Sequence, residues 1–134
     1  MTVLGKKTWT ETGLDVSKGQ IIHFEAEGGM SLQMGNPIAY CGPEGYSMKT
    51  VQQPVEDKNI GALIGKVVKL LSIEEDEETG EEIRNEKTEL FYIGPENEVR
   101  MPLSGKLHLG INEDVTEDND GEYRVKFYLE KDAR

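Results

Sequence analysis

The sequence predicts an all-β protein whose strands form a sandwich or a barrel. In three segments apolar and polar residues alternate with a period of two, which places an apolar row on one face of a strand. Turn sequences rich in Gly and Pro separate these segments, and no stretch of 10 residues shows helical spacing bounded by caps, apart from one turn near 57–62. Short alternating strands joined by regular turns favour a sandwich or a barrel.

The alternating segments have the sequences GQIIHFEAEG, GKLHLGIN and EYRVKFYLE. Their apolar rows are Ile22, Phe24 and Ala26 in the first, Leu107, Leu109 and Ile111 in the second, and Tyr123, Val125, Phe127 and Leu129 in the third. Because side chains alternate between the two faces of a strand, each row predicts one buried face. Further strands are expected at residues 62–73 and 89–93 and in a short piece around Trp9.

A chain of 134 residues has the length of one ordinary domain, so we expect a single domain over residues 1–134. No apolar run approaches the ~20 residues of a membrane span, and the first residues, MTVLGKKTWTETG, lack the apolar core of a signal peptide. We therefore expect a cytoplasmic location, or export without a recognisable signal peptide. Cys41 is the only cysteine, which excludes an intramolecular disulfide and a cysteine-rich zinc site.

The chain is acidic, with 26 acidic residues, 15 basic residues and a formal net charge of −11. Such a surface repels phosphate backbones, and the sequence contains no basic stripe, so we expect no nucleic-acid partner. Many carboxylates fall in IEEDEETGEEIRNEKTE, where we expect an acidic hairpin extension at about 73–89 that turns at Gly80. Flexible runs of Glu bind cations weakly, so we expect a solvated surface there and no calcium site.

A second acidic stretch, INEDVTEDNDGEY, mixes Asp and Asn with Gly between two predicted strands. Calcium takes about six to eight oxygen ligands, which short Asp and Asn side chains and backbone carbonyls supply on a tight loop at small entropic cost. An EF-hand in register with Gly121 would begin at Thr116 and would require Glu where the chain has Phe127, so that motif is excluded. On residue chemistry alone, a calcium site of another kind and a solvated turn both remain open.

Short motifs are spread over most of the chain: Thr12-Gly13 and the turn at Gly19 after Trp9, EAEGG at the end of a strand, CGPEG at 41–45, GALIGKV at 61–67, FYIG at 91–94, SGKLHLGINE at 104–113 and DNDG at 118–121. The last two are the most specific, because they combine a small-residue turn, a strand, Asn112-Glu113, a short loop and Asp118-Asn119 before Gly121. In these motifs and their order the chain resembles the PA-IL (LecA) family of bacterial galactophilic lectins. The resemblance implies a galactose-binding-domain-like jelly roll, which is an antiparallel β-sandwich.

The resemblance also implies one bound Ca²⁺ ion, which coordinates sugar hydroxyls while neighbouring carboxylates accept their protons. The implied metal ligands are the side chains of Glu113, Asp118 and Asn119 and backbone carbonyls at Val115 or Thr116 and near Leu32. The resemblance implies Gln53, Glu113, Asp114 and Asp118 as sugar-binding residues. Tyr40 and Tyr46 are added on residue chemistry, because they are aromatic residues that flank GPEG and can stack on a sugar ring. The expected partner is therefore a galactoside-like carbohydrate. The resemblance further implies a homo-oligomer, in which shallow, weak sites act together.

Two positions depart from the family pattern. Glu113 stands where the family usually has Asp, and its extra methylene moves the carboxylate away from a tightly bound ion; Asp114 is the neighbouring alternative. Met48 stands where the family has a galactose-contacting His, and the family's Gln has no clear counterpart, since only Gln52 or Gln53 could replace it. These departures favour a second interpretation, a protein-interaction or structural β-sandwich module that has lost sugar binding.

We expect no enzymatic activity. His23 and His108 each lie on the polar face of a predicted strand, where a lone imidazole is more often a surface residue than a base or a ligand. Cys41 lies in a Gly-Pro turn, and no feature of the sequence places a His beside it. Among 26 acidic residues some pair always has the separation of a glycosidase pair, so the carboxylates carry no catalytic signal.

Overall fold

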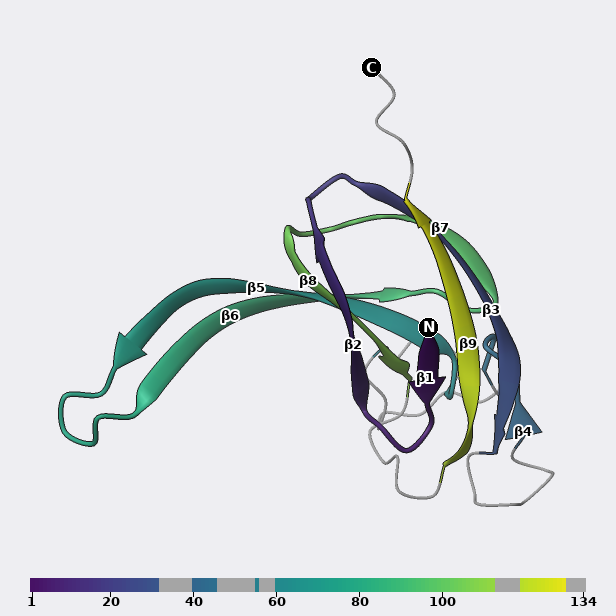
Figure 1. Cartoon of the computed structure of the whole chain (residues 1–134), viewed down its shortest axis with the longest axis horizontal. Helices are drawn as coiled ribbons and strands as arrows, with labels where there is room; N and C mark the ends of the chain where they lie inside the picture. Colours follow the sequence, from purple (N-terminus) through teal and green to yellow (C-terminus); the bar gives the residue numbers. More distant parts are fainter. Residues whose placement is uncertain (32–39, 46–54, 56–59, 113–118, 130–134) are drawn as a thin grey trace.

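The computed structural model describes residues 1–31, 40–45, 55, 60–112 and 119–129. Within these residues the chain forms nine β-strands and no helix (Figure 1). The strands are β1 Thr2–Leu4, β2 Trp9–Val16, β3 Ile21–Ser31, β4 Tyr40–Cys41, β5 Leu63–Glu75, β6 Glu82–Tyr92, β7 Glu96–Arg100, β8 Gly105–Ile111 and β9 Asp120–Leu129. They pair into two antiparallel sheets, which confirms the predicted all-β sandwich. The described part of the chain holds no helix that could cross a membrane.

The first sheet is built around β3. Its strand order is β1-β9-β3-β4, and β7 also pairs with β3. Along one edge β3 pairs with β9, from Ile22 opposite Leu129 to Ser31 opposite Asp120. The other edge is shared, because residues 21–25 pair with β7 while the last two residues of β3 pair with β4. The end of β3 that carries Ser31 therefore lies between β4 and β9.

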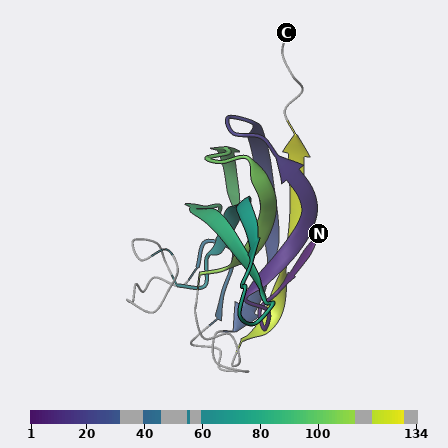
Figure 2. The same ribbon diagram turned by 90° about the vertical axis from the view of Figure 1, so that its left-hand side faces the viewer.

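The second sheet has the order β2-β8-β5-β6. β8 pairs with the first part of β5, from Leu63 opposite Ile111 to Val68 opposite Lys106. Beyond Val68, β5 pairs only with β6 among the described residues. This outer part of the hairpin, residues 69–87, projects from the sandwich and is called the arm below (Figure 1). In the view turned by 90° the arm points toward the viewer (Figure 2).

The turn at the tip of the arm is shaped by Asp76 and Gly80. Asp76 Oδ1 accepts hydrogen bonds from the backbone N–H groups of Glu78 at 2.8 Å and Thr79 at 3.3 Å, and the Gly80 N–H donates to the Asp76 carbonyl at 2.7 Å. Gly80 has a φ of 75°, which residues with a Cβ rarely adopt. The chain therefore reverses around Gly80, and strands occupy most of the acidic segment 73–89.

The core lies between the two sheets and contains most of the predicted apolar rows. Ile22, Phe24, Leu107, Leu109, Ile111, Tyr123 and Val125 are all at most 1% exposed. The ring of Phe24 lies 6.2 Å from that of Phe91 and 6.4 Å from that of Phe127, so aromatic contacts join the sheets. The prediction is wrong for Leu129, which is 49% exposed because it lies at the end of β9.

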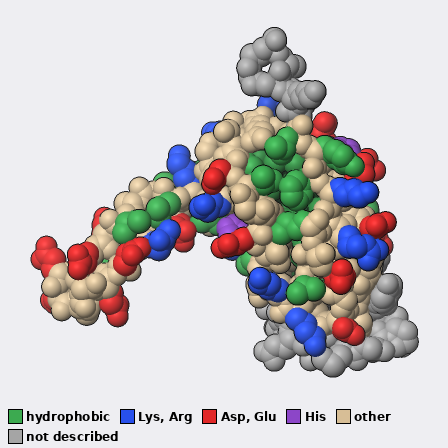
Figure 3. All heavy atoms as spheres, viewed as in Figure 1, with side chains coloured by type: hydrophobic (Ala, Val, Ile, Leu, Met, Phe, Trp, Pro, Cys, Tyr) green, Lys and Arg blue, Asp and Glu red, His purple; other side chains and the backbone are tan. Residues whose placement is uncertain are grey.

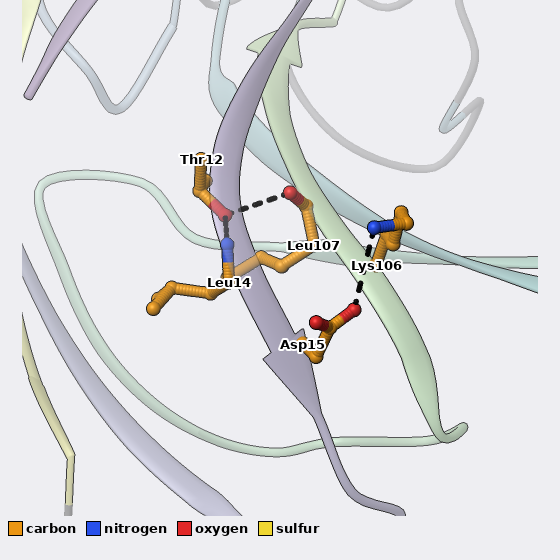
Figure 4. Close-up of polar contacts among 5 residues, drawn as sticks. All are labelled: Thr12, Leu14, Asp15, Lys106 and Leu107. Atoms are coloured by element: carbon orange, nitrogen blue, oxygen red, sulfur yellow. Dashed lines mark hydrogen bonds and ion pairs between the residues drawn. The ribbon is translucent and has the colours of Figure 1, made fainter.

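β2 carries a bulge before Asp15, where its pairing with β8 is interrupted. In the bulge the Thr12 hydroxyl donates a hydrogen bond of 2.8 Å to the Leu107 carbonyl and accepts one of 3.1 Å from the Leu14 N–H (Figure 4). Where the pairing resumes, Lys106 Nζ lies 3.6 Å from an Asp15 oxygen. The Thr12 side chain thus replaces a backbone partner at the bulge, which gives the Thr-Gly motif a structural role.

Candidate functional site

Several strand ends that border the segments with predicted site residues lie together at one end of the sandwich, which we call the loop end. Here Ser31 of β3 lies opposite Tyr40 of β4 on one side and opposite Asp120 of β9 on the other. In the second sheet β5 begins and β8 ends at the pair of Leu63 with Ile111, and Figure 1 shows the start of β5 and the end of β8 at the same end of the sandwich. The described chain therefore leads into and out of the following segments at this end: 32–39, 46–54, 56–59 and 113–118.

Most of the predicted site residues fall outside the described residues: Leu32, Tyr46, Gln53, Glu113, Asp114, Val115 and Asp118. Two fall within them, namely Tyr40, whose backbone pairs with Ser31, and Asn119, whose side-chain contacts are described. Ser31 precedes Leu32 in the chain and lies opposite Asp120, which follows Asn119. The register therefore brings the attachment points of two predicted ligand segments together, while the ligand roles stay predictions.

Asn119 is fully buried immediately before β9. Its Nδ2 donates a hydrogen bond of 2.9 Å to the Gly5 carbonyl, and this contact fixes which side of the amide is nitrogen, because only the NH₂ group is a donor. Asn119 Oδ1 has no hydrogen-bond partner among the described residues. A buried carbonyl oxygen without a partner costs about 1–3 kcal/mol, so this atom is an acceptor that a cation or a donor would stabilise.

Gly5 holds Asn119 in place from the turn that follows β1. Its N–H donates to the Gly121 carbonyl at 3.0 Å, while its carbonyl accepts the Asn119 amide. A Cβ added at Gly5 would lie 2.8 Å from Met30 Sδ and 3.1 Å from Asn119 Cβ, closer than packed interiors normally allow. The N-terminal turn thus belongs to the structure that positions Asn119, a role that no sequence motif indicated.

Asn112 joins two of the segments that carry predicted site residues. It is fully buried, and its Oδ1 accepts a hydrogen bond of 2.7 Å from the Val55 N–H while its Nδ2 donates one of 2.9 Å to the Val55 carbonyl. Its own backbone bonds to Gly61 and Ala62 at 3.0 and 2.9 Å. Val55 follows the segment that contains Gln53, and Asn112 directly precedes Glu113, so this contact anchors both segments to one point.

Tyr123 connects the CGPEG turn to the start of the second sheet. Its buried hydroxyl lies 2.8 Å from the carbonyl oxygens of both Gly42 and Gly61 and 3.3 Å from Cys41 Sγ. A hydroxyl has one hydrogen, so it donates to one carbonyl at a time. Cys41 is only 6% exposed beside it, which fits a packed thiol better than an accessible nucleophile.

Among the described residues one group brings three potential metal ligands together outside the loop end. His23, Glu25 and Glu96 offer ligand atoms within 4.8 Å of one another on β3 and β7. His23 Nε2 lies 3.5 Å from Glu25 and 3.2 Å from Glu96, and both carboxylates are about half exposed or more, at 49% and 65%. Exposed contacts of this kind between an imidazole and carboxylates are common and contribute little, so they account for the group and we place no metal site there.

The outer face of the second sheet carries opposing charges. Burial lowers the pKa of His108 below its ordinary value, Lys66 lowers that pKa further, and Glu11 and Glu86 oppose the shift. Burial also lowers the pKa of Lys66, whose Nζ lies 4.4 Å from the centre of the Trp9 ring. One face of this aromatic ring is therefore occupied by a lysine, which makes Trp9 a poor platform for a sugar.

Comparison with known proteins identifies the fold. No family model and no curated protein matches the sequence. A solved structure described as "EclA N-terminal domain; PllA-like lectin" matches with a TM-score of 0.66 at 21% sequence identity, covering 97% of this chain and 94% of that chain. The chain therefore has the fold of that lectin domain over nearly its whole length, which confirms the fold that the resemblance to PA-IL-like lectins implies.

Proposed function

We propose that this chain is a non-catalytic, lectin-type module that binds a galactose-like sugar through a calcium ion at the loop end. The observation that carries the proposal is Asn119 Oδ1, a buried amide oxygen held in position by Gly5 and left without a hydrogen-bond partner among the described residues. The match to a PllA-like lectin domain along 97% of the chain supports the same conclusion. Amide, carboxylate and carbonyl oxygens are the ligands that calcium prefers, so the donors at this end fit the ion.

In this proposal Asn119, Asp118 and Glu113 hold the ion with their side chains, and Val115 and Leu32 contribute backbone carbonyls. The ion, when bound, supplies open coordination positions for two vicinal hydroxyls of a sugar. The residues proposed to contact the sugar are Tyr40, Tyr46, Gln53, Asp114 and the two ligand carboxylates. Charged hydrogen bonds from sugar hydroxyls to carboxylates are stronger than neutral ones, which favours a polar ligand at this acidic end.

The direct test is the thermal unfolding midpoint in EDTA and in millimolar calcium, with magnesium as the control ion. An ion present at about 100 times its dissociation constant stabilises the folded state by about 2.7 kcal/mol, which raises the midpoint of a domain of this size by a few degrees. We expect a rise with calcium and little change with magnesium. Equal midpoints in EDTA and calcium would rule out a resident calcium ion.

A pair of variants distinguishes calcium binding at the proposed site from nonspecific binding to the acidic surface. Asp118→Ala and Glu77→Ala each remove one carboxylate, the first from the proposed ligand set and the second from the tip of the arm. We expect calorimetric titration to show weaker calcium binding for Asp118→Ala alone. If both variants bind as the wild type does, the ion is held elsewhere. Titration of galactose with and without EDTA then tests whether sugar binding requires the ion.

The alternative function, a protein-interaction or structural module, is favoured by one structural observation. Several large apolar side chains are exposed on the arm, where a lectin site at the loop end does not use them. This alternative predicts no sugar binding at any calcium concentration. The departures at Glu113 and Met48 point the same way, so a glycan screen in calcium distinguishes the two functions.

A further inference from the structure

The arm exposes apolar side chains that the sandwich does not cover. The large hydrophobic residues exposed on the arm and their exposed fractions are Leu70 42%, Leu71 58%, Ile73 55% and Ile83 43%. Figure 3 shows hydrophobic side chains along the arm and acidic ones gathered at its tip. Solvent-exposed apolar residues concentrated on one projecting element are typical of a surface that binds a protein partner.

The arm also presents strand edges that pair with nothing else among the described residues. β6 is the last strand in the order β2-β8-β5-β6, and β8 reaches only to the pair of Lys106 with Val68. The arm is therefore a two-stranded ribbon, which is marginally stable in water unless further strands or a packed face support it. An unpaired edge is a template for another strand, so the arm is suited to pairing with a strand from outside this chain.

The charges on β6 are ordered so that the strand complements itself. Arg84 and Glu86 are two residues apart and therefore point to the same face of the strand. When two β6 strands run antiparallel about a two-fold axis centred on Asn85, Arg84 of each copy lies opposite Glu86 of the other. The same register sets Glu82 opposite Thr88, so no like charges face each other along this stretch.

Neighbouring registers are unfavourable. A slip that keeps the faces of the two strands aligned must move the strands by two residues. Such a slip places Glu86 opposite Glu86 in one direction and Arg84 opposite Arg84 in the other. Like charges directly opposite each other destabilise a strand pair and opposite charges stabilise it, so the charge pattern disfavours both registers adjacent to the one centred on Asn85.

We propose that this chain forms a two-fold homodimer through antiparallel pairing of β6 with β6 of a second copy. Pairing converts two ribbons into one four-stranded sheet and covers the free edge of β6 in each copy. Ile73 lies opposite Arg84, and Leu70 lies opposite Glu86, within one copy. Across the joined sheet, four side chains therefore lie side by side: Leu70 and Glu86 of one copy, then Arg84 and Ile73 of the other. The methylenes of Arg84 lie against these exposed aliphatic side chains.

Arg84 is available for this contact. Its guanidinium lies 3.2 Å from Glu82 of the same strand, and the two side chains are 54% and 56% exposed. A guanidinium has five N–H donors in a planar fork, so it keeps Glu82 while binding a carboxylate of the second copy. The acidic turn at 76–81 lies beyond the first residue of β6 and so outside the paired stretch.

Charge reversal tests the proposal through sedimentation equilibrium or light scattering of the full chain. Arg84→Glu and Glu86→Arg each place like charges opposite each other. We expect the dissociation constant of the dimer to rise by about tenfold or more in each variant. The double variant, Arg84→Glu with Glu86→Arg, restores opposite charges and should restore the dimer. An equimolar mixture of the two single variants should form heterodimers, because the two acidic positions of one copy then lie opposite the two basic positions of the other.

The control is Arg124→Glu, which reverses an arginine of similar exposure, 58%, on the first sheet. It should dimerise as the wild type does, and circular dichroism should show that every variant keeps its strands. A monomeric wild type at about 100 μM, far above the dissociation constants of specific protein complexes, would overturn the proposal. So would a dimer that persists in Arg84→Glu, or single variants that fail to associate when mixed. None of these outcomes depends on calcium or sugar.

Discussion

The side-chain amide of Asn112 and the backbone of Val55 form a reciprocal pair of hydrogen bonds, with Val55 N–H donating to Oδ1 at 2.7 Å and Nδ2 donating to the Val55 carbonyl at 2.9 Å. The amide thus pairs with the backbone as a neighbouring strand would. Asn112 is buried and directly precedes residues 113–118 in the sequence, so this contact ties the start of that acidic stretch to Val55.

The first prediction concerns this pair. Replacing Asn112 by Ala removes both hydrogen bonds and a buried polar side chain, and we expect the free energy of unfolding to fall by about 2–3 kcal/mol. Chemical denaturation with urea measures the change. Asn85→Ala is the matched control, because it removes an exposed amide that donates to Ser72 Oγ at 2.7 Å, and it should cost much less. Equal losses would mean that the Val55 contact has no special role.

A second prediction concerns the Tyr123 hydroxyl. Tyr123→Phe keeps the ring in the core and removes the one donor shared by the Gly42 and Gly61 carbonyls. We expect a loss of about 1–2 kcal/mol in unfolding free energy, since a buried acceptor then lacks this donor. Tyr128→Phe, at a position 52% exposed, should change stability little. A neutral Tyr123→Phe variant would show that the hydroxyl does not hold the CGPEG turn.

Gly5→Ala tests the support of Asn119. The new methyl group would approach Met30 Sδ and Asn119 Cβ at 2.8 and 3.1 Å, so one of these side chains must move. We expect lower stability in EDTA, by about 1–3 kcal/mol, and weaker calcium binding by the protein that remains folded. The two effects are read separately, by denaturation in EDTA and by calcium titration well below the midpoint. Unchanged calcium affinity would mean that Asn119 needs no help from Gly5 to bind the ion.

The strands with apolar rows could be predicted from the sequence, and those without could not. β3, β8 and β9 have strict alternation because one face of each packs in the core. β7, with the sequence ENEVR, was missed, since Val99 is its only large apolar residue. β1 has only three residues, too few to show an alternating pattern. Tertiary pairing with β3 and β9 defines these edge strands, and local sequence does not encode that pairing.

For the arm and for the candidate site, too, the local sequence does not reveal the long-range contacts. Dense carboxylates in 73–89 predict a solvated extension, while the length of the paired strands follows from a register that composition does not reveal. The resemblance implies Asn119 as a ligand, but the Gly5 carbonyl that accepts its side-chain amide is 114 positions away in the sequence. No periodicity signals a contact between a turn glycine and a loop amide at such a separation.

The last prediction concerns pH and His108. Burial and Lys66 lower the pKa of His108 in the folded state below its ordinary value of 6.5. In the unfolded chain the imidazole takes up a proton near pH 6.5, so below that pH the unfolded state binds more protons than the folded state. Stability should therefore decline as the pH falls from 7.5 through about 6.5. The decline from this group ends below its folded pKa.

His108→Gln should remove that part of the decline, which urea denaturation between pH 7.5 and 5.5 would show as a smaller slope than the wild type has. His23 lies on β3 of the other sheet with carboxylate neighbours of its own, so His23→Gln serves as a control variant. His108→Gln should therefore reduce the slope of unfolding free energy against pH by the same amount in the wild type and in a His23→Gln background. The effects of mutations at distant sites on the free energy add. If His108→Gln leaves the slope unchanged, the imidazole is not destabilised as a cation by burial and Lys66, and the outer face of the second sheet is better solvated than its geometry indicates.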